Sequence, residues 1–368
     1  MSQQGKSLFV AIELSNKKWK LAFGDGSQVR ERSMEARSET VFLAEVRVAR
    51  EKLGLAADAA VVCCYEAGRD GFWIDRMLKK QGFRNHVMDP ASIEVPRRSR
   101  TRKTDRLHAR KLLKLLLRSE LGGERDSFSA VHVPSEAQEA EMRTHRERER
   151  LVKERTGHRA RMKSLCVLHG VQVSNPANVV IEQLRDWEGK PLGGPWVEEL
   201  KREQQRLWLT EEQLKAIEQQ QAAGLAEGGT VALKKAAKLY QLKAVGPQSS
   251  WLLSHECFAW RTFQNRKKVG AFAGLTGTPY DSGETLREQG ISKAGSGRVR
   301  TTMIELAWSW VRWQPNSALT HWFVDHYVRG GTSRSKRKGI VALARKLLVA
   351  FWKYVEQDIV PEGALLRA

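Results

Sequence analysis

The sequence has few cysteines and no long apolar run, and both absences narrow the class of protein. Its 368 residues include only 4 cysteines, and these lack the Cys-x-x-Cys spacing of zinc sites and redox motifs. We therefore expect neither a zinc site nor a disulfide. No apolar stretch approaches the length needed to cross a bilayer, and the N-terminus lacks the pattern of a signal peptide. We expect a soluble protein of the cytoplasm or nucleoid that does not act at a membrane.

Acidic residues are also scarce relative to basic ones. The chain has 63 Lys+Arg against 42 Asp+Glu, which gives a formal net charge of +21. Such a charge favours polyanionic partners, so DNA and RNA are the expected ligands. Hydrophobic residues make up 41% of the chain, enough to bury a core, and the length predicts two or three domains rather than a disordered basic tail.

Residues 1–130 show strand patterns that alternate with helix patterns. Residues 59–66 are continuously apolar up to Glu66, which is typical of a central strand covered on both faces. The adjacent Cys63 and Cys64 should then point to opposite faces of the sheet. These patterns predict an α/β domain with a mixed sheet of ribonuclease-H-like topology. The expected elements are strands at 7–14, 19–23, 59–66 and 84–88, helices at 40–53 and 71–81, and a helix that starts within 103–109 and carries Asp105.

The rest of the chain is predicted to be mainly helical. Residues 131–230 carry charged residues with apolar ones at helical spacing, and a Gly/Pro-rich break at 189–195 divides them into two long helices. We expect an antiparallel coiled-coil hairpin that supports dimerisation, with nucleic-acid contacts in residues 143–163. Residues 231–368 form a third unit that begins with a helix–turn–helix at 239–254. Its tryptophans are expected to lie in the core, including Trp308, Trp310 and Trp313.

Four residues in the first domain form a candidate metal site. Glu13 and Glu66 end two predicted strands, which a parallel pairing would bring side by side. Asp105 and His108 are three residues apart on a predicted helix and share a face. Phosphodiester-cleaving enzymes commonly hold divalent cations with several carboxylates. Each residue alone has an ordinary structural explanation, such as a helix cap for Asp105, but the four together predict a site for Mg²⁺ or Mn²⁺.

A candidate nucleophile lies far along the chain. Ser282 precedes Gly283 in a glycine-rich stretch, 274–298, where we expect flexible turns to expose its hydroxyl. Lys293, Arg298 and Arg300 follow and could neutralise a phosphate. A lone serine proves nothing by itself, and the same residue could belong to an ordinary turn.

A run of cations directly precedes Asp105. We expect the scissile strand to approach there, because positive side chains beside a carboxylate site would neutralise its phosphates. The run consists of Arg97, Arg98, Arg100, Arg102 and Lys103.

The order of these motifs resembles that of the DEDD transposases, insertion-sequence recombinases related to the invertases of pilin genes. The resemblance spans nearly the whole chain. It is carried by Tyr65-Glu66-Ala67-Gly68, Asp89-Pro90, Lys103-Thr104-Asp105, Ser282-Gly283 and Ile291-Ser292-Lys293-Ala294-Gly295. The resemblance implies a domain similar to the Holliday-junction resolvase RuvC, a coiled coil that supports oligomerisation, and a C-terminal transposase domain with a catalytic serine. It also implies a structured noncoding RNA as guide for donor and target DNA.

Carried over by position, the resemblance makes Glu66 and Asp105 catalytic acidic residues and Ser282 the nucleophile. Glu13 and His108 depart from the pattern, since the family has aspartate at both positions. Imidazole in place of a carboxylate shifts the preference from Mg²⁺ toward Mn²⁺. Two alternatives remain open at this point: a metal-dependent junction nuclease without strand transfer, and a non-catalytic nucleic-acid-binding copy.

Overall fold

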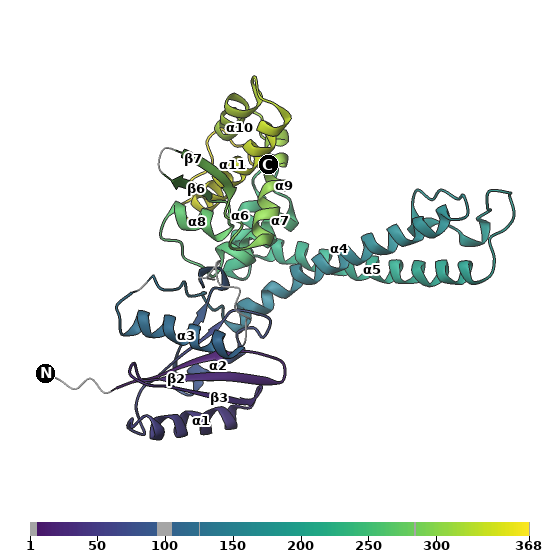
Figure 1. The fold of residues 1–368 in the computed structure, drawn as a ribbon. Coiled ribbons are helices and arrows are strands. Elements are labelled where there is room, and N and C mark those ends of the chain that lie inside the picture. The colour runs from purple at the N-terminus through teal and green to yellow at the C-terminus, as the bar shows by residue number, and fades with distance from the viewer. Residues whose placement is uncertain (1–5, 94–104, 125, 283–284, 368) are drawn as a thin grey trace. The chain divides into compact units, whose positions relative to one another are not determined.

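The chain folds into two units, Met1–Pro134 and Ser135–Ala368. The structure is a computed structural model that describes residues 6–93, 105–124, 126–282 and 285–367 (Figure 1). The first unit combines a sheet with helices, and the second is mostly helical. The protein is therefore a mixed α/β protein with a large helical part.

A five-stranded mixed sheet forms the centre of the first unit. Its spatial order is β3-β2-β1-β4-β5, in which β1 pairs antiparallel with β2 and parallel with β4. The pair β2 and β3 is antiparallel, and β4 and β5 are parallel. The strands are β1 (Leu8–Glu13), β2 (Lys18–Gly24), β3 (Val29–Glu35), β4 (Val61–Glu66) and β5 (Arg84–Met88).

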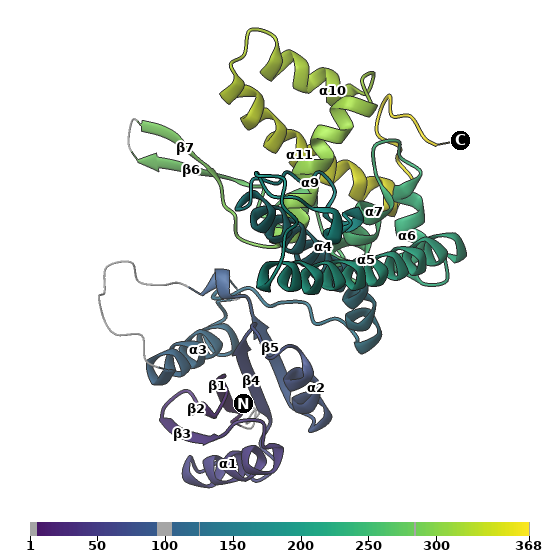
Figure 2. The same cartoon turned by 90° about the vertical axis from the view of Figure 1, so that its right-hand side faces the viewer.

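Helices cover both faces of this sheet (Figure 2). On one face, Leu8, Val10 and Ile12 of β1 pack with residues of α1 (Glu39–Lys52) and α2 (Trp73–Lys80). On the other face, Phe9 and Ala11 pack against α3 (Asp105–Glu120). This two-residue alternation arises because successive strand side chains point to opposite faces.

The cysteine pair follows the same alternation. Cys63 lies in the cluster under α1 and α2, and Cys64 lies in the cluster under α3, which confirms the predicted opposite orientations. Both thiols are free and fully buried, so they act as small apolar side chains.

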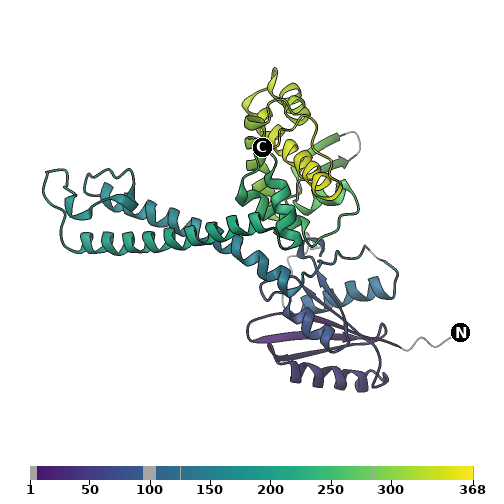
Figure 3. The same ribbon diagram turned by 180° about the vertical axis from the view of Figure 1, so that it is seen from behind.

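Two long helices lie side by side in the second unit: α4 (Glu136–Val167) and α5 (Pro195–Glu227) (Figures 1 and 3). A capping box at Ser135 begins α4. Between α4 and α5 in the sequence lie two short 3₁₀ helices, η2 (Pro176–Asn178) and η3 (Ile181–Gln183). Apolar residues at helical spacing form the seam of this hairpin: Leu151, Met162, Cys166, Leu200, Leu207, Leu214 and Ile217.

A buried carboxylate crosses the same seam. Glu203 is 1% exposed, and its oxygens lie 2.7 Å from His158 Nδ1 on α4 and 2.6 Å from Arg206 Nη1 on α5. Arg161 on α4 donates a further hydrogen bond to it. Burial raises the pKa of Glu203, but the three donors outweigh this effect and hold the pKa below its ordinary value.

The remaining helices pack around a single large apolar core that contains Trp310, Phe351 and Leu347. The elements are α6 (Val231–Tyr240), α7 (Pro247–Leu253), η4 (Ser254–Phe258), α8 (Arg266–Phe272), α9 (Gly297–Trp313), α10 (Ala318–Phe323), η5 (Val324–Val328) and α11 (Ser333–Gln357). Both η4 and η5 are single π-helical turns. Among the described helices, none has a stretch that is long and apolar enough to span a membrane.

Three details differ from the sequence-based expectations. Strand β3 was not predicted, because its polar residues, such as Glu31 and Arg32, lie on an edge strand that is largely exposed. Trp310 is buried as expected, but Trp308 and Trp313 are about half exposed. The expected flexible turns at 277–291 are instead an antiparallel hairpin of β6 (Gly277–Ser282) and β7 (Thr285–Ile291).

Candidate active site

Glu13 and Glu66 end two neighbouring parallel strands. In the register of β1 and β4, Ile12 pairs with Tyr65, so the two glutamates follow at the same edge of the sheet. Glu13 is two residues from Ala11, and Glu66 is two residues from Cys64. Since Ala11 and Cys64 face α3, the strand alternation directs both carboxylates to that face. The predicted side-by-side placement of these two residues is confirmed.

Helix α3 brings His108 to the same place. Ala109, Leu112 and Leu116 are buried against the sheet and dock this side of the helix. His108 lies four and eight residues before Leu112 and Leu116, so it belongs to the same stripe, one turn nearer the N-terminus. The apolar periodicity of α3 therefore positions the imidazole over the edge where β1 and β4 end.

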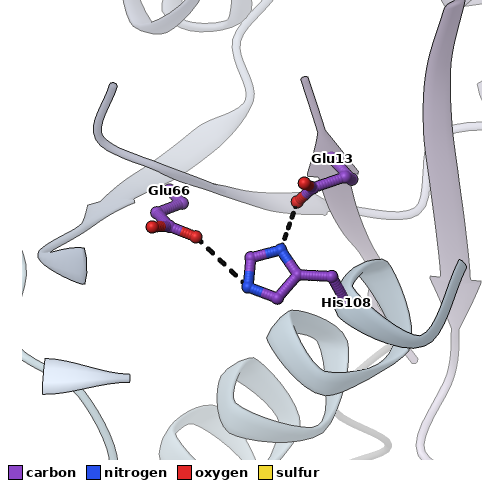
Figure 4. A group of neighbouring side chains, drawn as sticks. All are labelled: Glu13, Glu66 and His108. Carbon is purple, nitrogen blue, oxygen red and sulfur yellow. Dashed lines mark hydrogen bonds and ion pairs between the residues drawn. The ribbon is translucent and has the colours of Figure 1, made fainter. Parts of the chain in front are cut away.

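The three side chains converge (Figure 4). His108 Nδ1 lies 2.5 Å from Glu13 Oε2, and His108 Nε2 lies 3.2 Å from Glu66 Oε2. One ligand atom from each residue lies within 4.8 Å of the others. The side chains are 11% exposed for His108, 19% for Glu13 and 32% for Glu66. This cluster, hereafter the Glu–His–Glu cluster, is therefore largely buried but remains in contact with solvent.

The cluster has the donor chemistry of a cation site. Two carboxylate oxygens face the two ring nitrogens of one imidazole, so several metal-ligand atoms meet at one point. Two carboxylate oxygens and one imidazole nitrogen are ligands that Mn²⁺ accepts, and Mg²⁺ less readily. The residues present fit the metal that the sequence predicted.

Asp105 is the first residue of α3, three positions before His108. Its side chain lies outside the described part of the structure. The predicted phosphate-binding residues Arg97, Arg98, Arg100, Arg102 and Lys103 also lie outside the described residues.

Ser282 is the last residue of β6 and pairs with Thr285 at the end of the hairpin ladder. Residues 283 and 284 between them are outside the described residues, as is the Ser282 side chain. The backbone thus places the predicted nucleophile at the end of a two-stranded hairpin in the second unit (Figure 2).

The base of this hairpin is held tightly. Gly274 and Gly295 have φ values of +64° and +107°, and a Cβ at either would overlap a backbone carbonyl oxygen. Only glycine fits such positions without strain. Arg300 donates to the carbonyls of Ala273 at 3.0 Å and Lys293 at 3.1 Å. The two ends of the Ser282 hairpin are therefore tied to each other and to α9.

The predicted phosphate-binding residues of this region have different surroundings. Lys293 is exposed, whereas Arg300 is engaged by the two carbonyls. Arg298 forms an ion pair with Glu149 of α4 at 2.7 Å. Many cations of the 143–163 segment are paired too, which lowers the charge available to nucleic acid. These pairs are Arg146–Glu256, Arg148–Glu218, Lys153–Glu149, Arg159–Glu211 and Arg161–Glu203.

A second cluster of buried charged groups was not predicted from the sequence. Glu256 in η4 accepts hydrogen bonds from His145 Nε2 at 2.8 Å and Arg146 Nε at 2.7 Å, both on α4. Burial raises the pKa of Glu256, but these two donors outweigh burial and bring the pKa down to about 2. The neighbouring His255 stacks on Trp251, with ring centroids 4.5 Å apart. Only its position in a π-helical turn, invisible in the sequence, brings Glu256 to α4.

Comparisons with known proteins identify the family. Residues 236–321 match the transposase family described as IS116/IS110/IS902. The chain is 38% identical over 379 residues to y4rJ of Sinorhizobium fredii, a protein named as a transposase, and the match covers 98% of this chain and 95% of that protein. It is 27% identical over 251 residues to y4qE of the same organism, also named as a transposase, covering 68% of this chain and 58% of that protein.

A more distant relative has a similar name. A protein of Pseudomonas aeruginosa named as a family 20 transposase is 25% identical over 240 residues, which covers 64% of this chain and 68% of that protein. The chain is thus a transposase, an enzyme of DNA transposition. More particularly, the chain belongs to the IS116/IS110/IS902 transposase family.

Proposed function

We propose that this transposase cuts and rejoins DNA with Ser282 as nucleophile and the Glu–His–Glu cluster, together with Asp105, as a metal-assisted site. The observation that carries the proposal is the convergence of Glu13, Glu66 and His108 at one edge of the sheet. Carboxylates and an imidazole that project from strand ends and a helix form a typical setting for phosphoryl-transfer chemistry. The strand order of the first unit supports a ribonuclease-H-like or RuvC-like assignment.

Glu13, Glu66 and His108 would hold a divalent cation, with Asp105 as a further oxygen ligand from the start of α3. When bound, such a cation stabilises negative charge on a reacting phosphate. The protein's part is to hold the ligand atoms at the sheet edge, since α3 is docked by its buried apolar stripe.

The serine step exchanges one phosphate ester for another. Ser282 Oγ forms a bond to phosphorus while one P–O bond of the DNA backbone breaks. The serine proton is transferred to a nearby proton acceptor, and the leaving oxygen of the DNA gains a proton. The energy of the broken ester is retained in the phosphoserine link, so a DNA hydroxyl can reverse the step and rejoin a strand. The anchored base of the β6–β7 hairpin supports this role, because a nucleophile must be held in a defined position.

A guide RNA is part of the proposal. The net charge of +21 supports binding of more than one polyanion, and the resemblance of the sequence to RNA-guided recombinases supplies the RNA as partner. Sequencing of the nucleic acid that copurifies with the chain tests this point. A preparation that contains only random RNA fragments would contradict it.

We also propose that the chain forms homo-oligomers through the end of the α4–α5 hairpin. Large apolar side chains are exposed there: Val167 62%, Leu168 67%, Val180 51% and Trp187 77%. Exposed apolar side chains grouped at one place are typical of interaction sites. Trp187→Asp should lower the molar mass measured by light scattering, whereas Trp313→Asp, at another exposed tryptophan, should not. An unchanged mass in Trp187→Asp would contradict the assignment.

The carboxylate assignment is tested by Glu66→Gln, with Glu35→Gln as matched control. Both changes neutralise a glutamate that ends a strand, but Glu35 is exposed on the edge strand β3, away from the cluster. We expect Glu66→Gln to abolish cleavage of a plasmid that carries the insertion sequence while DNA affinity is kept. Near-normal cleavage by Glu66→Gln would refute the site.

The serine assignment is tested by trapping a covalent protein–DNA adduct. Ser282→Ala should eliminate the adduct, and Ser292→Ala, in the same segment, should keep it.

The Glu–His–Glu cluster lies in the first unit and Ser282 in the second, so a metal-dependent junction nuclease is a second candidate function. Metal-dependent cleavage of a branched DNA without any adduct in the wild type would favour that nuclease.

A further inference from the structure

A groove opens beside the Glu–His–Glu cluster, on the α3 face of the sheet. Its volume is about 640 Å³, and it is lined by residues of β2, β3 and α3 that include Lys20, Glu31, Ser33, Ala109 and Arg110. Ala109 and Arg110 directly follow His108, so one wall of the groove continues the helix turn that carries the imidazole. No residue of this groove was singled out from the sequence.

The strand register connects the groove to the cluster. Glu13 on β1 pairs with Lys20 on β2, and Lys20 pairs with Ser33 on β3. Directly paired residues of adjacent antiparallel strands share a face, with Cβ atoms about 4.5–5.5 Å apart. Glu13, Lys20 and Ser33 therefore form a row across three strands, which leads from the Glu–His–Glu cluster into the groove.

The cations that line the groove differ in their partners. Arg110 forms an ion pair with Glu31. Arg32 forms one with Glu45, in which Arg32 Nε lies 3.8 Å from Glu45 Oε2. Lys20 donates a hydrogen bond to the hydroxyl of Ser33. Within the described residues, Lys20 has no carboxylate at ion-pair distance. Its half-buried ammonium is therefore not held in an ion pair by any carboxylate of the described residues.

We propose that this groove binds the backbone of the DNA strand that is cut, and that Lys20 contacts a phosphate next to the reacting one. The inference rests on the proposed function, because it takes the Glu–His–Glu cluster as the site of cleavage. A phosphate fits this place because an ammonium and a hydroxyl, Lys20 and Ser33, can both donate to its oxygens. A lysine binds phosphate as a point charge without reading the base.

DNA is the expected occupant because the groove adjoins the cluster where the DNA ester would be broken. An RNA strand offers the same phosphates, so the two sources must be separated by experiment. Lys20 is a positioning residue in this proposal: it orients the strand and takes no part in bond breaking.

The test measures binding in the Glu66→Gln background, where cleavage is not needed. Lys20→Met and Lys20→Gln remove the charge, and Lys20→Arg keeps it. Lys52→Met is the matched control, since Lys52 is exposed at the end of α1, on the opposite face of the sheet. Affinity for a four-way DNA junction is measured at several salt concentrations. Loss of one phosphate contact should lower the slope of log K against log salt by about 0.9 in magnitude.

We expect this change of slope for Lys20→Met and Lys20→Gln, and an unchanged slope for Lys20→Arg and Lys52→Met. The affinity itself should fall roughly tenfold, the effect of one lost charge-assisted hydrogen bond. Equal slopes for Lys20→Met, Lys20→Gln and Lys52→Met would overturn the proposal.

A neutral-phosphate scan identifies the strand. Methylphosphonates are placed singly along the junction DNA. At one position, the substitution should weaken binding by the Glu66→Gln protein, which keeps Lys20, and should have no effect on the protein that also carries Lys20→Met. The same scan along the copurified RNA should show no Lys20-dependent position. A Lys20-dependent position in the RNA would overturn the assignment to DNA. If Glu66→Gln itself cleaves normally, the proposed function fails, and that outcome is distinct from any result on Lys20.

Discussion

His255 should make the second unit less stable as the pH falls below neutral. The pKa of this imidazole is lowered from 6.5 to about 4, mainly by burial and in smaller part by the nearby His145. A hydrogen bond from its Nδ1 to the Trp251 carbonyl and the charge of Glu256 raise the pKa but do not cancel the effect of burial. The carboxylate of Glu141 lies 4.0 Å from Nε2. Within the described part of the chain, Nε2 has no hydrogen-bond partner.

The sign of this pH dependence follows from the pKa of His255, which is higher in the unfolded chain than in the folded chain. Between about pH 6.5 and about pH 4 the unfolded chain binds a proton at His255 and the folded chain does not, so the free energy of unfolding falls as the pH falls. Over the whole interval between these two pKa values, the free energy of unfolding falls by about 3 kcal/mol. About 2 kcal/mol of this is lost between about pH 7 and about pH 5. Glu256, with its pKa of about 2, contributes its own loss only below about pH 4.5.

Hydrogen exchange of the segment containing α7 and η4, corrected for the intrinsic exchange rates, measures the opening free energy there. The wild type should lose about 2 kcal/mol over this pH interval. His255→Phe keeps a ring to stack on Trp251 but cannot titrate, so it should lose far less. An equal loss in both proteins would refute the reasoning, because the pH dependence would then arise from other groups.

Three further predictions concern the site and its surroundings. His108→Asp should raise the affinity for Mg²⁺ relative to Mn²⁺ in calorimetric titrations, because a carboxylate replaces imidazole; an unchanged ratio would show that His108 is not a ligand. Replacing Arg97, Arg98 and Arg100 by alanine should lower the salt slope of DNA binding by about 0.9 for each lost phosphate contact, and a constant slope would place the contact surface elsewhere. Gly295→Ala should lower the free energy of unfolding by roughly 1–3 kcal/mol through backbone strain, whereas a neutral effect in thermal unfolding would show that the hairpin base adapts.

The sheet edge of the site could be predicted because strand signals are local. The continuous apolar pattern up to Glu66 and the first strand up to Glu13 determine both the strands and their last residues. Parallel pairing then requires the two carboxylates to meet. His108 was predicted from its spacing of three residues from Asp105, which places both on one face of a helix. These parts of the site depend on periodicity alone, which the sequence carries directly.

Other features could not be predicted because they depend on distant packing. Trp308 and Trp310 are two residues apart on α9, and only the position of the helix against the core decides that one is exposed and the other buried. The contact of Glu256 with His145 joins residues that are 111 positions apart. Lys20 looks like any strand lysine until the register with Glu13 is known. Each case needs a tertiary neighbour that no local pattern specifies.

The buried Glu203 has a mechanical consequence for the α4–α5 hairpin. If α5 slid along α4 by one turn, the carboxylate would lose His158 and Arg161 and remain buried with much of its charge uncompensated, which would cost several kcal/mol. Sliding of α5 along α4 is therefore disfavoured. The two helices should therefore move together as one rod, so a force applied at one end of the hairpin is transmitted to its other end.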